Sequence, residues 1–181
     1  MIKIALCKFN NMLLSKHYKL LRACLPHDIK QKFDKVKTDK QKQFVALQYL
    51  LLKTLLGKKD KIEIKTPKNG KPFIDGAKAF NESHSGDYFA LAIGDNKPIG
   101  IELQKVTNVK EKHLKRICSD EELDTIGNDS FEFTKLWTRK ESYIKMKGQT
   151  IIQDLRKIDT IKNKNRFKTF EFKDYVLTVC V

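Results

Sequence analysis

The side chains best suited to chemistry in this sequence are gathered in one stretch of nine residues, Trp137–Lys145. In a helix that turns about 100° per residue, an aromatic, an aliphatic and three charged side chains of this stretch fall within a sector of roughly 140°. They belong to Trp137, Lys140, Glu141, Ile144 and Lys145. An amphipathic helix normally keeps its charges away from its apolar stripe, so the charges on this face must be satisfied by a partner.

Two interpretations of this face are open from the residues alone. Glu141 and Lys145 have the i,i+4 order of an intrahelical ion pair, which contributes about 0.3–0.5 kcal/mol at a surface. Alternatively, the Glu141 carboxylate and the ammonium groups of Lys140 and Lys145 hold a metal ion and phosphate groups beside the ring of Trp137. The helix by itself favours the ion pair, and the rest of the chain decides.

A β-hairpin is predicted upstream of this helix. The apolar runs 88–93 and 99–103 are separated by five turn residues, a spacing typical of two paired strands. The second run contains Glu102, an acid in an otherwise apolar strand, and Gln104 points the same way because strand side chains alternate. The segment 80–88 just before the hairpin is too rich in small polar side chains to be core.

The remaining elements follow from periodicity and stop signals. The order of strands and helices predicts an α+β fold class, with two similar halves of about ninety residues. We expect helices at 13–25, 39–56, 119–126 and 130–147, and strands at 1–7, 62–65, 158–161, 167–172 and 175–181. A turn is expected at 69–73, where Asn-Gly and Pro stand.

Composition limits the class of partner. The chain has 181 residues, and 37 Lys and Arg against 22 Asp and Glu give a net charge of +15. Such a surface favours an acidic partner, which charge alone leaves open as nucleic acid, an anionic membrane, a phosphorylated ligand or an acidic protein. No membrane span or secretory signal is recognisable, and the four cysteines show no metal-binding spacing, so we expect a cytoplasmic protein with reduced thiols.

Four motifs in order resemble those of the 4′-phosphopantetheinyl transferases, specifically the larger monomeric type that activates peptide, polyketide and fatty-acid synthases. That family carries a GKP turn, an F-N-x-S-H-S segment, a G-[IV]-D-[IV]-E strand and a W-x-x-K-E-[AS]-x-x-K helix. The corresponding residues here are Gly70-Lys71-Pro72, Phe80-Asn81-Glu82-Ser83-His84-Ser85, Gly100-Ile101-Glu102-Leu103-Gln104 and Trp137–Lys145. The resemblance covers roughly residues 69–148. Each motif is weak alone, and the four in order are specific.

The resemblance implies a fold and a reaction. The fold is a pseudo-twofold pair of α+β halves, each a small antiparallel sheet packed with a long helix. Residues 1–98 would form the half with coenzyme A-binding elements, and residues 99–181 the half with the metal-binding strand and the helix. The reaction moves the 4′-phosphopantetheine arm of coenzyme A to a Ser of an apo acyl or peptidyl carrier protein, releasing adenosine 3′,5′-bisphosphate.

The resemblance also implies residue roles. Mg²⁺, or Mn²⁺, would bind Glu102, Gln104 and Glu141, with Glu141 as the base for the carrier Ser. Lys145 would stabilise or protonate the leaving phosphate, and Lys140 would assist it electrostatically. Coenzyme A would contact a set of seven residues, Lys71, Pro72, Ser83, His84, Trp137, Lys140 and Lys145. The expected partners are coenzyme A and an acidic carrier protein, with no nucleic acid and no membrane, and the protein is expected to be a monomer.

One departure from the family pattern keeps alternatives open. The family strand usually carries Asp and then Glu two residues on, where this chain has Glu102 and Gln104. The predicted metal site is therefore one charge poorer, which also fits a catalytically impaired family member. A basic nucleic-acid- or protein-binding module is the other alternative, although carboxylates at the centre of the motifs would repel a phosphate backbone.

Overall fold

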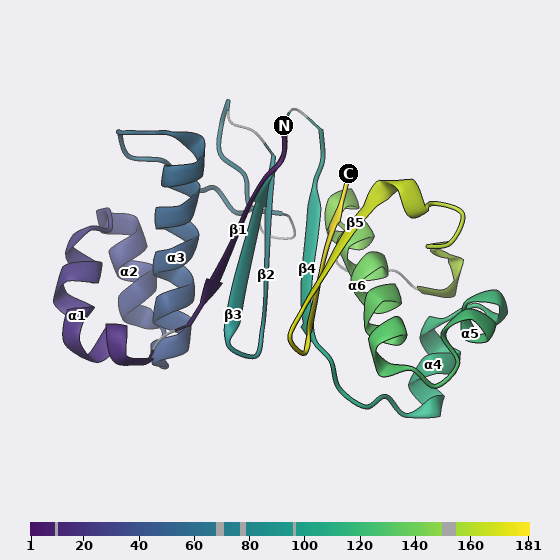
Figure 1. Ribbon diagram of the computed structural model, residues 1–181. Coiled ribbons are helices and arrows are strands. Elements are labelled where there is room, and N and C mark those ends of the chain that lie inside the picture. Colours follow the sequence, from purple (N-terminus) through teal and green to yellow (C-terminus); the bar gives the residue numbers. More distant parts are fainter. Residues whose placement is uncertain (10, 68–70, 77–78, 96, 150–154) are drawn as a thin grey trace.

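The structure is a computed structural model that describes residues 1–9, 11–67, 71–76, 79–95, 97–149 and 155–181. The described chain forms four layers, in which two three-stranded sheets face each other and helices cover the two outer sides (Figure 1). The predicted turn at 69–73 lies partly outside the described residues, since Asn69 and Gly70 are not among them. No described helix is long and apolar enough to cross a membrane.

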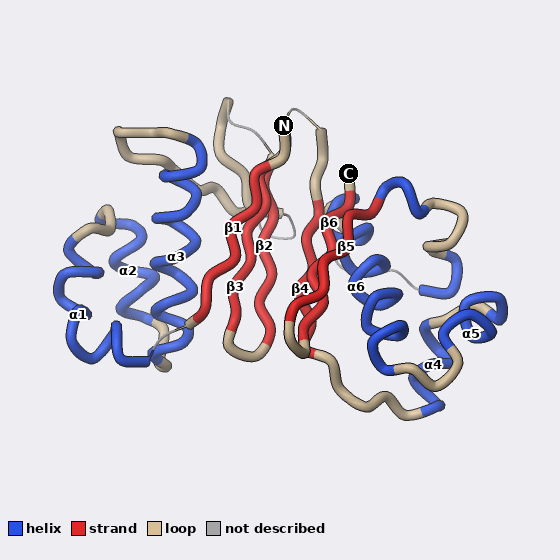
Figure 2. Tube along the Cα trace, viewed as in Figure 1, coloured by secondary structure: helices blue, strands red, loops and turns tan. Residues whose placement is uncertain are grey.

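The first half of the chain builds one sheet and the helices on its outer face (Figure 2). Its strands are antiparallel in the order β1-β3-β2. In chain order the elements are β1 (Lys3–Lys8), α1 (Asn11–Ala23), α2 (His27–Lys35), α3 (Asp39–Leu56), β2 (Phe80–Ser85) and β3 (Tyr88–Ile93).

The second half repeats this plan, with a strand, three helices and then two strands in the sheet order β4-β6-β5. Its elements are β4 (Gly100–Lys105), α4 (Glu111–Ile117), α5 (Asp120–Ile126), α6 (Ser130–Lys147), two short 3₁₀ turns, η1 (Leu155–Lys157) and η2 (Lys164–Arg166), β5 (Phe167–Phe172) and β6 (Tyr175–Cys180). The predicted α+β class and its pair of similar halves are confirmed. The boundary at 98/99 stays a prediction, and it falls between the last strand of the first sheet and the first strand of the second.

The long helices α3 and α6 begin and end where local signals place them. Thr38 caps α3 in a reciprocal capping box with Gln41, and Asp129 caps α6 by accepting from two backbone amides. Both helices end at a glycine in the left-handed region, Gly57 with φ 65° and Gly148 with φ 69°. The predicted limits of both helices are therefore confirmed.

Alternation along the strands separates two cores. Phe89, Leu91 and Ile93 of β3 pack in the cluster beneath the first-half helices, whereas Ala90 and Ala92 pack with the second sheet. The alanines of β3 leave room for the larger side chains of β4 and β6, among them Ile101, Leu103 and Leu177. The sheet-to-sheet contact is thus a core of its own, with β2 and β4 closest to each other.

Helix α6 lies very close to β4 at Gly100. A Cβ built on Gly100 would stand 1.8 Å from the backbone oxygen of Ser142 and 2.5 Å from the nitrogen of Met146. Only glycine permits this approach, since no Cβ atom can come so near to backbone atoms. The contact fixes β4 against the helix that carries Glu141 and Lys145.

Several predicted elements are wrong. The expected hairpin between 88–93 and 99–103 does not form, because β3 pairs with β2 through the turn at Gly86, which has φ 51°, and β4 enters the other sheet. Residues 62–65 contribute only an isolated bridge from Lys65 to Phe73, and residues 158–161 form turns.

Helices α2 and α4 were not predicted. The signal for α2 was present, because Ile29 and Phe33 stand at i,i+4 and are its buried residues. Its start directly after Pro26 is a position where proline is tolerated.

Candidate active site

The edge strands β2 and β4 run side by side and are joined through side chains, in a contact that we call the seam. Asn81 Oδ1 accepts from the Ile101 amide at 2.8 Å, and Ser85 Oγ accepts from the Lys105 amide at 3.0 Å. Ser83 Oγ donates to Glu102 Oε2 at 3.0 Å. The expectation that segment 80–88 lies outside the core is therefore wrong, because its alternate polar side chains satisfy the exposed edge of β4.

Glu102 and Lys145 meet at the middle of the seam. Lys145 Nζ lies 2.5 Å from Glu102 Oε2 and donates to the main-chain oxygen of Glu82 at 3.3 Å. Side-chain exposure is 13% for Glu102 and 30% for Lys145, so the pair is partly shielded from water. The ammonium from α6 thus joins strands of both sheets, and the charged face of the helix is more than a surface intrahelical pair.

Glu141 completes this group. Burial raises the pKa of its carboxyl, the nearby charge of Glu102 raises it further, and the charge of Lys145 opposes both. Two carboxylates of like charge therefore stand close enough to repel each other, with one ammonium beside them. The structure brings four predicted site residues together here, Ser83, Glu102, Glu141 and Lys145.

His84 lies at the border of the group. Burial lowers the pKa of its imidazole, and the charges of Lys40 and Lys145 lower it further. Its ring meets Phe44 of α3 edge-on, with centroids 5.0 Å apart. His84 and Lys40 line a pocket of about 280 Å³ in the first half, so this side of the seam offers an imidazole and an ammonium to an anion.

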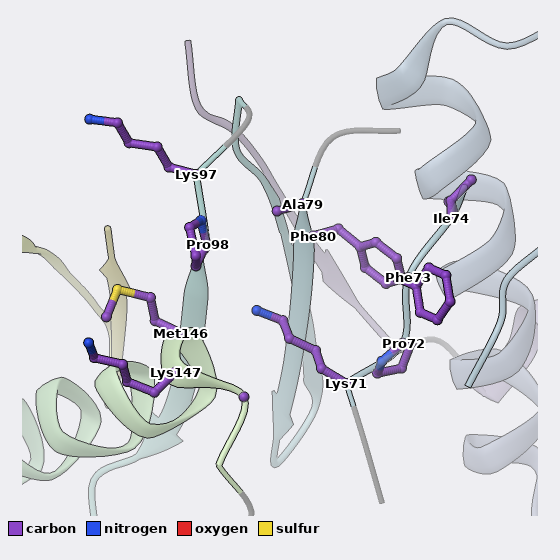
Figure 3. A pocket seen from close by; sticks show the side chains of 11 residues that line it. Lys71, Pro72, Phe73, Ile74, Ala79, Phe80, Lys97, Pro98, Met146 and Lys147 are labelled. Carbon is purple, nitrogen blue, oxygen red and sulfur yellow. The ribbon is translucent and has the colours of Figure 1, made fainter. Parts of the chain in front are cut away.

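Lys71 and Pro72 line a different pocket of about 500 Å³, between the first-half loops and the end of α6 (Figure 3). The Lys71 ammonium contacts the main-chain oxygens of Ile99 and Lys145, the latter at 3.2 Å. Burial lowers the pKa of Lys71 to about 8, with a further contribution from the charge of Lys145. Gly70 of the same predicted motif lies outside the described residues.

Gln104 and Trp137 lie together on the other side of the central group. Both line a pocket of about 430 Å³ with residues of α4, among them His113. The Gln104 side-chain amide donates to the main-chain oxygen of Lys105 at 3.1 Å, which leaves its carbonyl oxygen available as an acceptor. The contact of Trp137 with coenzyme A stays a prediction.

Lys140 is not brought to the central group. Its side chain is fully buried, and its ammonium contacts Glu122 Oε2 at 2.6 Å and the main-chain oxygen of Leu155 at 2.9 Å. Glu122 is bound in turn by the Thr160 hydroxyl at 2.9 Å. Lys140 and Lys145 stand at opposite limits of the roughly 140° sector, so they face different neighbours. Our proposal for the site therefore leaves Lys140 out.

Sequence reasoning missed Glu82. This residue fills the variable position of the F-N-x-S-H-S segment, and its carboxyl accepts from Gln48 Nε2 of α3 at 2.7 Å. Burial raises the pKa of Glu82 to about 7. The signal that could have found Glu82 is its position two residues after Phe80, which places an acid on the same side of β2 as this apolar residue, the side that packs against helix α3.

The donor chemistry fits a hard divalent cation. Glu102 and Glu141 supply two mutually repelling carboxylates, and Gln104 adds a carbonyl oxygen on the same face of β4. Within the described ranges, no group of three or more His, Cys, Asp or Glu side chains stands ready to hold a metal. Mg²⁺ binds through one or two carboxylates together with substrate phosphates and water, so two carboxylates suffice.

Comparison with known proteins finds the same resemblance. Residues 98–180 match the family model of the 4′-phosphopantetheinyl transferase superfamily, so the sequence-based resemblance to that superfamily is confirmed.

Among curated proteins, the chain is 37% identical over 98 residues to the 4′-phosphopantetheinyl transferase Sfp of Bacillus subtilis, covering 50% of this chain and 43% of that protein. It is 36% identical over 85 residues to the transferase gsp of Aneurinibacillus migulanus, covering 44% and 35%. With psf-1 of Bacillus pumilus it shares 28% identity over 123 residues, covering 64% and 52%. The chain therefore spans about half the length of these relatives, or less.

Proposed function

We propose that this protein transfers the 4′-phosphopantetheine arm of coenzyme A to a Ser of an apo acyl or peptidyl carrier protein, as a holo-[acyl-carrier-protein] synthase. The observation that carries the proposal is the group formed by Ser83, Glu102, Glu141 and Lys145, which three of the four sequence motifs bring to one seam. The similarity to proteins named 4′-phosphopantetheinyl transferases supports it.

The proposed residue roles follow from charge and position. Lys145 attracts the pyrophosphate of coenzyme A, with Ser83, His84 and Lys71 as further donors around it. The Ser hydroxyl of the carrier attacks the phosphorus that bears the pantetheine arm, and a new P–O bond forms as the bond to the bridging oxygen breaks. Glu141 takes the hydroxyl proton, and its raised pKa makes it a better base than an exposed carboxylate. Adenosine 3′,5′-bisphosphate leaves, and Lys145 stabilises the charge that develops on it.

Metal and partners belong to the same proposal. Glu102 and Glu141, with the carbonyl oxygen of Gln104, would hold Mg²⁺ or Mn²⁺, which when bound neutralises the charge of the pyrophosphate. Trp137 would shape the wall of the site. The net charge of +15 suits an acidic carrier protein. We further propose a cytoplasmic monomer whose halves divide at 98/99.

The test is direct transfer. Purified protein, coenzyme A and Mg²⁺ are incubated with several apo carrier proteins, and intact mass is measured; we expect one phosphopantetheine arm on each accepted carrier. A variant of the carrier with Ser replaced by Ala is the control. A folded protein that binds coenzyme A and adds no mass to any carrier would contradict the transferase and favour the impaired family member. Binding of nucleic acid with no binding of coenzyme A would favour the basic binding module.

A further inference from the structure

Glu82 lies where the first-half core meets the seam. Its main-chain oxygen accepts from Lys145 on α6, and its side chain reaches Gln48 on α3. One carboxyl oxygen binds the Gln48 amide, whereas the other is buried and has no hydrogen-bond partner among the described residues. A buried carboxylate with an unsatisfied oxygen is costly to ionise, so this position is sensitive to the charges around it.

Lys145 on α6 is the charge that acts on the Glu82 carboxyl, and it favours the ionised carboxylate. Lys145 also forms the ion pair with Glu102 on β4. The charges of Lys145, Glu102 and Lys40 on α3 act in turn on His84, the neighbour of Glu82 on the same side of β2. The pKa of Glu82, raised by burial to about 7 and held down by Gln48 and Lys145, places this ionisation close to neutral pH.

We propose that Glu82 is a positioning residue that sets how strongly Lys145 attracts an anion at the seam, because its ionised carboxylate competes for the charge of Lys145. The anion is a pyrophosphate group. That this group is the pyrophosphate of coenzyme A rests on the proposed function. Binding of the anion draws Lys145 away from Glu82, so the Glu82 carboxyl takes up a proton from solvent. The anion then meets a seam with one negative charge fewer.

Inorganic pyrophosphate is the probe, and calorimetric titration without added metal is the measurement. Glu82→Gln keeps the shape of the side chain and the acceptor for Gln48 but cannot ionise. At pH 8 we expect this variant to bind pyrophosphate about three- to tenfold more tightly than the wild type, and at pH 6 equally tightly. Repeating the titration at pH 7.5 in buffers of different ionisation enthalpy measures proton uptake, which we expect to be smaller in the variant. Glu63→Gln makes the same chemical change at an exposed position and is the control.

Gln48→Met gives a second test that keeps the Glu82 carboxyl. This change removes the hydrogen bond that lowers the pKa of Glu82, so the pH at which affinity falls should move upward. Equal affinities and equal proton uptake in the wild type and Glu82→Gln at both pH values would overturn the proposal, as would absence of pyrophosphate binding to folded wild-type protein. These titrations contain no carrier protein, whereas the transfer assay requires one. A failure of transfer can therefore be distinguished from a failure of this inference.

Discussion

Replacing Lys140 by Met should destabilise the fold strongly, because Lys140 belongs to a buried ion pair. The side chains of Lys140 and Glu122 are 0% and 2% exposed, and their charged atoms lie 2.6 Å apart. The substitution leaves the Glu122 carboxylate buried without its ammonium partner, and it also removes the donor to the Leu155 carbonyl. Removing one member of a buried ion pair costs about 3–5 kcal/mol.

In a chain of this length, that loss lowers the melting temperature by about 6–20 °C. The double variant Lys140→Met with Glu122→Leu removes both charges. It should recover part of the loss, because an apolar pair carries no unpaired charge, and retain a deficit of about 1–3 kcal/mol from the Leu155 carbonyl and Thr160 hydroxyl left without partners.

Chemical unfolding in urea, followed by circular dichroism, measures these differences. Lys115→Met is the matched control, since Lys115 and Glu111 form an exposed ion pair. A loss below about 1 kcal/mol in the Lys140 single variant would refute the buried-pair reasoning. Transfer activity in the folded double variant, at a rate near that of the wild type, is expected if Lys140 acts only through the fold. Complete inactivity there would restore a direct catalytic role.

Four further predictions concern the seam. Gly100→Ala should lower the melting temperature and transfer activity together, because its Cβ would lie 1.8 Å from the Ser142 oxygen and force α6 away from β4; unchanged melting would contradict that close approach. Glu141→Gln should abolish transfer, measured by intact mass, and leave the melting transition in place, whereas loss of folding would indicate a structural role. Gln104→Glu should lower the Mg²⁺ concentration needed for half-maximal rate, and an unchanged metal titration would separate Gln104 from the metal. In urea unfolding, Glu82→Gln should stabilise the protein by about 1–3 kcal/mol at pH 8 and by nothing at pH 4. The reason is that the pKa of Glu82 is raised in the folded state, so the stability of the wild type falls as pH rises from about 4.5 through 7. The same difference in stability at both pH values would contradict the raised pKa of Glu82.

The sequence predicts the two long helices well, because their start and stop signals are local. Thr38 and Gly57 bound α3 through contacts within a few residues, and α6 ends at Gly148 for the same reason. The pairing of strands depends on distant partners. The turn residues at 94–98 predict a hairpin between the flanking strands, yet β3 pairs with β2 through the tighter turn at Gly86, and β4 pairs with β6 in the second sheet.

The candidate site shows the same difference between local signals, which the sequence displays, and contacts between distant residues, which it does not. Helical spacing correctly placed Glu141 and Lys145 near one another, and the acid at Glu102 did mark the seam. Spacing put Lys140 at the limit of the sector but did not show that its partner is Glu122, eighteen residues earlier in the chain. Glu82 was missed because the role of a buried acid depends on Gln48 and Lys145, which only the folded chain brings to it.

At the seam, β2 and β4 are held by hydrogen bonds that side chains make, and this gives the protein a mechanical property that a continuous sheet would lack. Ladder bonds between backbones hold two strands in one register, whereas Ser and Asn side chains rotate and follow small displacements without losing their bonds. We therefore expect small displacements of the two halves against each other along the seam. A ligand that bridges them would restrain that motion, and we expect hydrogen exchange of the Ile101 and Lys105 amides to slow when coenzyme A binds.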